Sequence, residues 1–140
     1  MDIEMLIHEA RAARDRAYAP YSAFRVGAAV LTRSGQVFRG TNVENGSYGL
    51  CICAERVALF AAIADGCHPG DFTHLAVIGD TEGPLAPCGA CRQVMMELGG
   101  AHLIVVQASL RGSVSQHTMD ELLPGAFELR PGAAAADPIR

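Results

Sequence analysis

Two short cysteine motifs constrain the fold of this chain more than any other feature of its sequence. They are Cys53-Ala54-Glu55 and Pro87-Cys88-Gly89-Ala90-Cys91, and each stands where a helix-forming stretch begins. Cys88 and Cys91, at i and i+3 on a helix, lie on one face with Cβ atoms about 5–6 Å apart. Zn–S bonds of about 2.3 Å close that gap, and Cys53 offers a third sulfur. We therefore expect the starts of two helices to meet around one zinc ion.

The residues after Cys53 favour a catalytic metal site over a structural one. Three protein ligands leave the fourth tetrahedral position of zinc for water. Glu55 is placed to take a proton from that water and return it to a substrate. Arg56 is expected to donate a hydrogen bond to a ligand sulfur and so raise the acidity of the water. The plain alternatives are an ordinary first-turn acid for Glu55 and a surface arginine without a role for Arg56.

The rest of the chain alternates helix and strand signals. Apolar residues at helical spacing predict an amphipathic opening helix, and turn residues separate a hairpin from the elements that follow. The expected helices cover 2–17, 53–64, 88–98 and 119–123, and the expected strands cover 24–32, 36–44, 73–79, 102–107 and a short stretch after 112. Continuous apolar strands between helices indicate a sheet covered on both faces. We predict an α/β fold, a three-layer α/β/α sandwich with a central mixed sheet of about five strands.

Length and composition narrow the class of protein. The chain has 140 residues, half of them hydrophobic, and we expect a single zinc domain over 1–130 with a flexible tail over 131–140. The formal charge is −4 and lysine is absent, which excludes Schiff-base lysine chemistry and argues against a nucleic-acid partner. Five cysteines, mostly in pairs, suit metal binding better than disulfides. We expect a cytoplasmic protein with no membrane partner, because no signal peptide or long apolar run is evident.

The motif pair resembles the signature of the cytidine and deoxycytidylate deaminase superfamily. Cysteine rather than histidine at position 53 resembles the small homotetrameric cytidine deaminases, which have a three-cysteine zinc site. Three further segments resemble that family: Tyr18-Ala19-Pro20-Tyr21-Ser22-x-Phe24-x-Val26-Gly27-Ala28-Ala29, Asn42-Val43-Glu44-Asn45 with Ser47-Tyr48-Gly49, and Leu123-Pro124-x-x-Phe127. The resemblance covers residues 5–128. Gly46 and Cys51 depart from it, at positions where Ala and a small or Thr-like residue are expected.

The resemblance implies an activity and a set of site residues. The activity is zinc-dependent hydrolysis of cytidine and 2′-deoxycytidine to uridine and 2′-deoxyuridine with release of ammonia, a step of pyrimidine salvage. It implies one zinc ion per subunit on the three cysteines, with Glu55 as the catalytic residue. The implied substrate contacts are Phe24 stacking on the pyrimidine, Asn42 and Glu44 on the ribose hydroxyls, the Ala54 backbone N–H on the base carbonyl, and Phe127 closing the site of a neighbouring subunit.

Several alternatives stay open at this point. Phe24 and Phe127 would otherwise be core aromatics, and Asn42 a turn residue. A deaminase of an aminoacyl-nucleoside antibiotic such as blasticidin S would have a similar zinc site. Cys51 together with Cys53, Cys88 and Cys91 would make a closed four-sulfur site in a non-catalytic module. Independently of the family, the Glu44 carboxylate would repel a 5′-phosphate, so the expected substrate is a nucleoside rather than a nucleotide, tRNA or single-stranded DNA.

Overall fold

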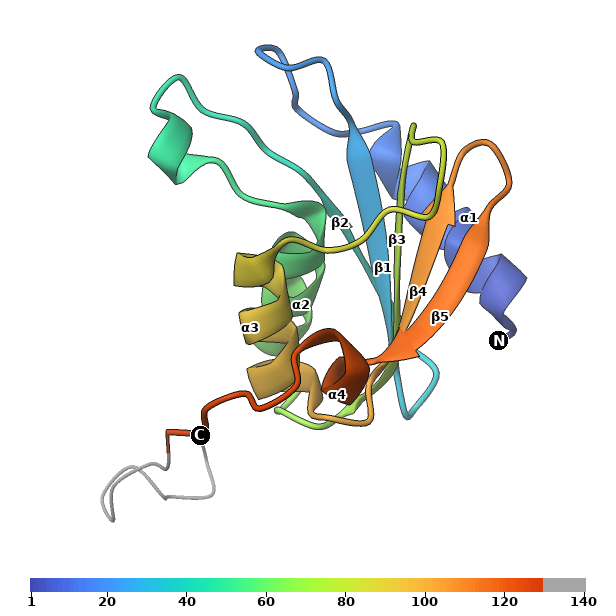
Figure 1. Ribbon diagram of the computed structural model, residues 1–140, viewed down its shortest axis with the longest axis vertical. Helices are drawn as coiled ribbons and strands as arrows, with labels where there is room; N and C mark the ends of the chain where they lie inside the picture. The colour runs from blue at the N-terminus through green and yellow to red at the C-terminus, as the bar shows by residue number, and fades with distance from the viewer. Residues whose placement is uncertain (130–140) are drawn as a thin grey trace.

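Five strands form one mixed sheet in the computed structural model, which describes residues 1–129 (Figure 1). They are β1 (Val26–Thr32), β2 (Val37–Thr41), β3 (Phe72–Gly79), β4 (Ile104–Ser109) and β5 (Val114–Thr118). Their order across the sheet is β2-β1-β3-β4-β5. β1 runs antiparallel to β2 and β3, β3 and β4 are parallel, and β5 is antiparallel to β4. The tail expected over 131–140 lies outside the described residues.

Helices cover both faces of this sheet. One face packs against α1 (Ile3–Arg14), and the other packs against α2 (Ala54–Ala64), α3 (Gly89–Gly99) and α4 (Met119–Leu122). Successive residues of β1 point to opposite faces, so Ala28 and Val30 join the α2 side of the core while Ala29 joins the α1 side. The predicted three-layer α/β/α sandwich is confirmed. No helix within residues 1–129 is long and apolar enough to cross a membrane.

A glycine in β2 sets the position of α2. A Cβ atom at Gly40 would collide with the carbonyl oxygen of Ala54 and the amide nitrogen of Ala58. The first turn of α2 therefore lies directly against the strand, closer than a side chain at position 40 would permit. This contact fixes the place of the first cysteine motif relative to the sheet.

Two arms of the chain project beyond one end of the sheet (Figure 1). The first arm, residues 15–25, leads into β1, and the second arm, residues 42–52, connects β2 to α2 and contains a 3-10 turn, η1 (Tyr48–Leu50). The arms are joined by backbone pairing of Tyr18 with Val43, and Val43 also pairs with Ile52. The rings of Tyr21 and Tyr48 meet edge to face, with centroids 6.1 Å apart.

Several predicted boundaries were wrong. The expected strand 36–44 ends at Thr41, because Val43 leaves the hairpin and pairs with the first arm, and the expected strand 24–32 begins only at Val26, where that arm ends. The strand expected over 102–107 lies instead at Ile104–Ser109. The opening helix ends at Arg14 rather than at residue 17, since its last turn closes on Asp15. α2 and α3 each begin one residue later than expected, because Cys53 and Cys88 are N-caps in extended conformation.

Candidate metal centre and adjoining cavity

The metal-binding residues come from the starts of α2 and α3. Cys53 and Cys88 occupy the N-cap positions, and neither side chain caps its own helix. Cys91 lies in the first turn of α3 and is buried. The three sulfur atoms lie within 4.8 Å of one another, and the Cys53 and Cys88 sulfurs are 3.7 Å apart. The structure thus brings together the three residues that the sequence singled out.

This arrangement fits a zinc ion. Tetrahedral geometry with Zn–S bonds of about 2.3 Å places ligand sulfurs roughly 3.8 Å apart. The Cys53–Cys88 separation already meets that requirement. Within the described part of the chain, these three cysteines are the group of His, Cys, Asp or Glu side chains close enough to share a metal.

Cys51 does not join the cluster. Its sulfur accepts a hydrogen bond from the backbone nitrogen of Asn45 at 3.3 Å and donates one to the Asn45 carbonyl oxygen at 3.6 Å. The Cys51 side chain is therefore bonded to the backbone of its own arm. In a closed four-sulfur site this thiol would have to give up both hydrogen bonds to Asn45.

Arg56 lies one turn along α2 and interacts with the cluster. Its Nη2 atom donates to the Cys53 sulfur at 3.4 Å, as the sequence predicted. Hydrogen bonds from Cys91 and Arg56 lower the pKa of Cys53 to about 5, while burial opposes them. The Nε atom of Arg56 is buried and has no hydrogen-bond partner among the residues described.

The charge on the three sulfurs depends on a cation. Donation to Cys53 and burial raise the pKa of the Cys91 thiol, so without a cation negative charge concentrates on Cys53. A divalent cation ionises the thiols that coordinate it. Zinc would therefore turn a shared proton network into three thiolates, with the Arg56 guanidinium and two helix N-termini offsetting their charge.

Glu55 is a buried acid beside the cluster. Its side chain lies in the first turn of α2 and the residue is only 4% exposed. Burial raises the pKa of Glu55 to about 7, and the neighbouring Cys53 charge adds to the effect. A first-turn acid that only balances the helix dipole would be exposed, and the dipole would lower its pKa rather than raise it. A carboxyl that titrates near neutrality is suited to proton transfer.

A cavity of about 300 Å³ lies next to these residues. Its walls come from both arms, the start of α2 and the segment before α3. The lining residues are Phe24, Val26, Asn42, Glu44, Cys51, Ile52, Cys53, Ala54, Glu55, Leu85, Ala86 and Cys88. A second hollow of about 400 Å³ lies around Arg33, Asp65 and Asp71, but it contains none of the predicted site residues. The smaller cavity is therefore the candidate site.

Four of the five predicted substrate residues line this cavity: Phe24, Asn42, Glu44 and Ala54. Phe127 does not; it is 68% exposed beyond α4. Four apolar residues of the wall, Val26, Ile52, Leu85 and Ala86, were not singled out from the sequence. They carry no chemical signature, and only the folded chain places them together.

The position of the Phe24 ring in the cavity wall depends on a glycine at the end of β3. A Cβ atom at Gly79, the last residue of β3, would lie 3.3 Å from the Phe24 Cζ atom and 2.9 Å from the Leu85 Cδ2 atom. Gly79 thus leaves room for both side chains at the end of the sheet. Phe24 is 38% exposed, so it is a cavity residue and not a core aromatic.

Asn42 and Glu44 also hold the first arm. The Asn42 amide accepts from the Val26 nitrogen and donates to the Phe24 carbonyl oxygen, both at 2.8 Å. Glu44 Oε1 accepts from the backbone nitrogens of Tyr21 at 2.9 Å and Ser22 at 3.1 Å. These contacts were not predicted, because they depend on pairing between the two arms.

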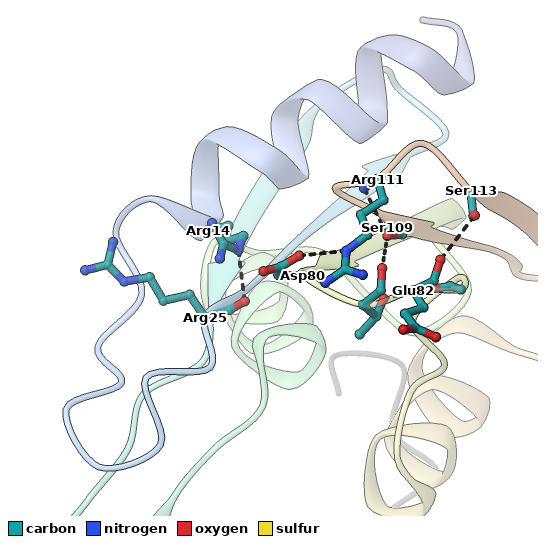
Figure 2. A network of polar contacts seen from close by, with 9 residues as sticks. Arg14, Arg25, Asp80, Glu82, Ser109, Arg111 and Ser113 are labelled. Atoms are coloured by element: carbon teal, nitrogen blue, oxygen red, sulfur yellow. Dashed lines mark hydrogen bonds and ion pairs between the residues drawn. The ribbon is translucent and has the colours of Figure 1, made fainter.

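A polar network fixes the loop that leads to Cys88 (Figure 2). Arg111 contacts Asp80 at 3.4 Å, and its backbone nitrogen donates to the Ser109 hydroxyl at 3.0 Å. The Ser113 hydroxyl donates to the Glu82 carbonyl oxygen at 3.4 Å. The loop from β3 to α3 is thereby held against the turn between β4 and β5, which positions the cavity wall at Leu85.

Comparison with models of known protein families shows the family to which the chain belongs. The family described as "Cytidine and deoxycytidylate deaminase zinc-binding region" matches residues 1–107, which include all three cysteines. The chain belongs to this deaminase family. Zinc is therefore its metal, and the resemblance seen in the sequence is confirmed.

Named relatives and solved structures agree with this affiliation. A cytidine deaminase of Halalkalibacterium halodurans is 54% identical over 127 residues, covering 91% of this chain and 95% of the relative. One of Sporosarcina psychrophila is 47% identical, covering 98% and 99%. The crystal structure of cytidine deaminase from Burkholderia pseudomallei matches with a TM-score of 0.90 and 58% identity, covering 91% of this chain and 100% of that one. The Mycobacterium tuberculosis enzyme matches with a TM-score of 0.79 and 40% identity, covering 92% and 99%.

Proposed function

We propose that this deaminase hydrolyses cytidine and 2′-deoxycytidine to uridine and 2′-deoxyuridine, with release of ammonia. One observation carries the proposal: Glu55, buried and with a pKa raised to about 7, lines the same cavity as Cys53 and Cys88 of the zinc cluster. The relatives named as cytidine deaminases match over nearly their whole length, which supports the substrate.

The proposed chemistry divides between the metal and the protein. Cys53, Cys88 and Cys91 would hold zinc, which lowers the pKa of water and so provides a nucleophile at neutral pH. Glu55 takes a proton from the attacking water and delivers it to N3 of the pyrimidine. It then carries the second proton of the water to the departing amino group, so that water and cytidine become uridine and ammonia.

The remaining cavity residues would orient the nucleoside. Phe24 stacks on the pyrimidine ring, and Asn42 and Glu44 bind ribose hydroxyls. The backbone N–H of Ala54 lies at the positive end of α2 and binds the base carbonyl oxygen. Each of these residues lines the cavity, which supports the assignment.

We further propose a homotetramer in which Phe127 completes the site of a neighbouring subunit. The exposed ring of Phe127, outside its own chain's cavity, supports this arrangement. Residues 1–130 would form one zinc domain. A three-thiolate site and five free cysteines suit the reducing cytoplasm, where the enzyme would serve pyrimidine salvage without a nucleic-acid or membrane partner.

Ammonia release from cytidine, with zinc measured in the same samples, tests the proposal. Glu55→Gln should keep zinc and lose about 10²–10⁴-fold in kcat. Glu4→Gln is the matched control, since Glu4 also lies in a first helical turn but on the opposite face of the sheet. Zinc-loaded protein that releases no ammonia from cytidine or 2′-deoxycytidine would overturn the proposal. Release from blasticidin S alone would favour the antibiotic deaminase.

A further inference from the structure

One hydroxyl group connects two walls of the candidate cavity. The Ser22 hydroxyl, on the first arm, donates a hydrogen bond to Glu44 Oε2. The Ser22 Oγ atom also accepts a hydrogen bond from the backbone nitrogen of Phe24 at 3.0 Å. Ser22 itself does not line the cavity, whereas both of its partners do.

The contacts of Glu44 leave one acceptor position open. Two backbone N–H groups, from Tyr21 and Ser22, occupy Oε1. Each carboxylate oxygen has two lone-pair positions, so Oε1 is filled and Oε2 keeps one position besides the Ser22 hydroxyl. The pKa of Glu44 is held below its usual value, chiefly by that hydroxyl. Ser22 thus decides which part of the carboxylate is free to accept from a ligand.

The contact with Phe24 spans a strained turn. Ala23 has a φ of 59°, the one positive φ of a non-glycine residue in the described chain. An alanine in this left-handed region is disfavoured and persists only where its neighbours fix the backbone. The Ser22 hydroxyl closes the turn on one side, and the Asn42 amide holds the Phe24 carbonyl oxygen on the other. The direction of the Phe24 ring therefore depends on Ser22.

We propose that Ser22 is a positioning residue, whose hydroxyl aligns the Glu44 carboxylate with the Phe24 ring so that ribose and base are bound together. The inference rests on the proposed function, because it requires a nucleoside in this cavity. Ser22 lies outside both the cavity lining and the metal cluster. Its effect is exerted through substrate binding and not through the hydrolytic step.

Two variants and a control separate this role from a structural one. Ser22→Ala should raise KM for cytidine by about 5–20-fold, the effect of losing one charge-assisted hydrogen bond. The kcat and the zinc content should stay near those of the wild type. Ser22→Thr keeps the hydroxyl and should restore KM. Ser34→Ala removes a hydroxyl that bonds Thr32 at 3.0 Å in the distant hairpin and should change neither constant.

Binding of the product uridine to zinc-loaded protein, measured by calorimetry, gives a readout without turnover. Ser22→Ala should weaken it by the same factor as KM. In a Glu44→Gln background the further effect of Ser22→Ala should be smaller than in the wild type, since the Ser22–Glu44 contact is already altered and only the contact with Phe24 remains to be lost. Wild-type binding by Ser22→Ala, or full additivity with Glu44→Gln, would overturn the inference alone. A wild type that neither binds uridine nor releases ammonia would overturn the proposed function as well.

Discussion

The sulfur atoms of Cys53 and Cys88 lie 3.7 Å apart, although 35 positions separate the two residues in the chain. Each sulfur belongs to an extended residue at the N-cap of a helix, so the position of that helix determines where the sulfur lies. The spacing of the sulfurs is therefore a property of how α2 and α3 meet. It depends on Gly40, which permits α2 to lie directly on the sheet.

Zinc analysis should show whether Cys51 is a fourth ligand of the metal. Cys88→Ser removes a ligand and should lose most of the zinc on dialysis against a chelator. Cys51→Ser should keep about one zinc per chain, because the Cys51 sulfur bonds Asn45 and lies outside the cluster. Metal analysis of both variants measures this directly. Loss of zinc from Cys51→Ser would instead support a closed four-sulfur site.

Replacement of Arg56 should lower the rate of deamination more than the zinc content of the protein. The Arg56 hydrogen bond to Cys53 withdraws charge from a ligand sulfur, so Arg56→Ala should reduce kcat/KM by about 10–100-fold. Arg56→Lys should recover only part of the loss, because an ammonium lacks the planar fork of donors. Steady-state kinetics with zinc analysis makes the comparison. Arg39→Ala, at an exposed arginine paired with Glu9, is the control, and equal kinetics for the two alanine variants would contradict the role of Arg56.

The negative charge of Glu44 should exclude nucleotides. A 5′-phosphate brought into the cavity would meet this carboxylate, so cytidine should exceed CMP by at least about 100-fold in kcat/KM. The lowered pKa of Glu44 keeps the carboxylate ionised as the pH falls, so the preference should persist from pH 8 down to about pH 5. Glu44→Gln should reduce the preference for cytidine over CMP. A wild type that uses CMP as well as cytidine would refute the argument.

The metal site could be predicted from sequence because its geometry is local. The i, i+3 spacing places Cys88 and Cys91 on one face, and a helix start at Cys53 supplies the third sulfur. The helix period and the chemistry of thiolates are enough for the cysteines. Glu55 was singled out because it is close to Cys53 in the chain, and the structure places both in the wall of one cavity.

The walls of the cavity required the folded chain. The pairing of Tyr18 with Val43 joins segments that carry no periodic signal, and it converts Asn42 and Glu44 into partners of the first arm. Ser22 was visible only as part of a family motif, because its hydroxyl acts across that pairing. Gly79 and Leu85 meet Phe24 through the order of β1 and β3 in the sheet, which the sequence does not encode locally.

Phe127 poses a different problem, since its proposed role depends on a second chain. If its ring stacks in a neighbouring subunit's site, Phe127→Ala should raise KM by about 10-fold with zinc unchanged. Leu129→Ala, at an 83% exposed residue of the same segment, is the control. Tetramers assembled from Phe127→Ala and Glu55→Gln chains give the sharper test. An intact Glu55 in the first chain and an intact Phe127 in the second would then meet in one site. The mixed tetramers should be more active than tetramers of either variant alone. Mixed tetramers that are no more active than the two variants would place Phe127 outside the site. A monomer, identified by light scattering, that is fully active would do the same.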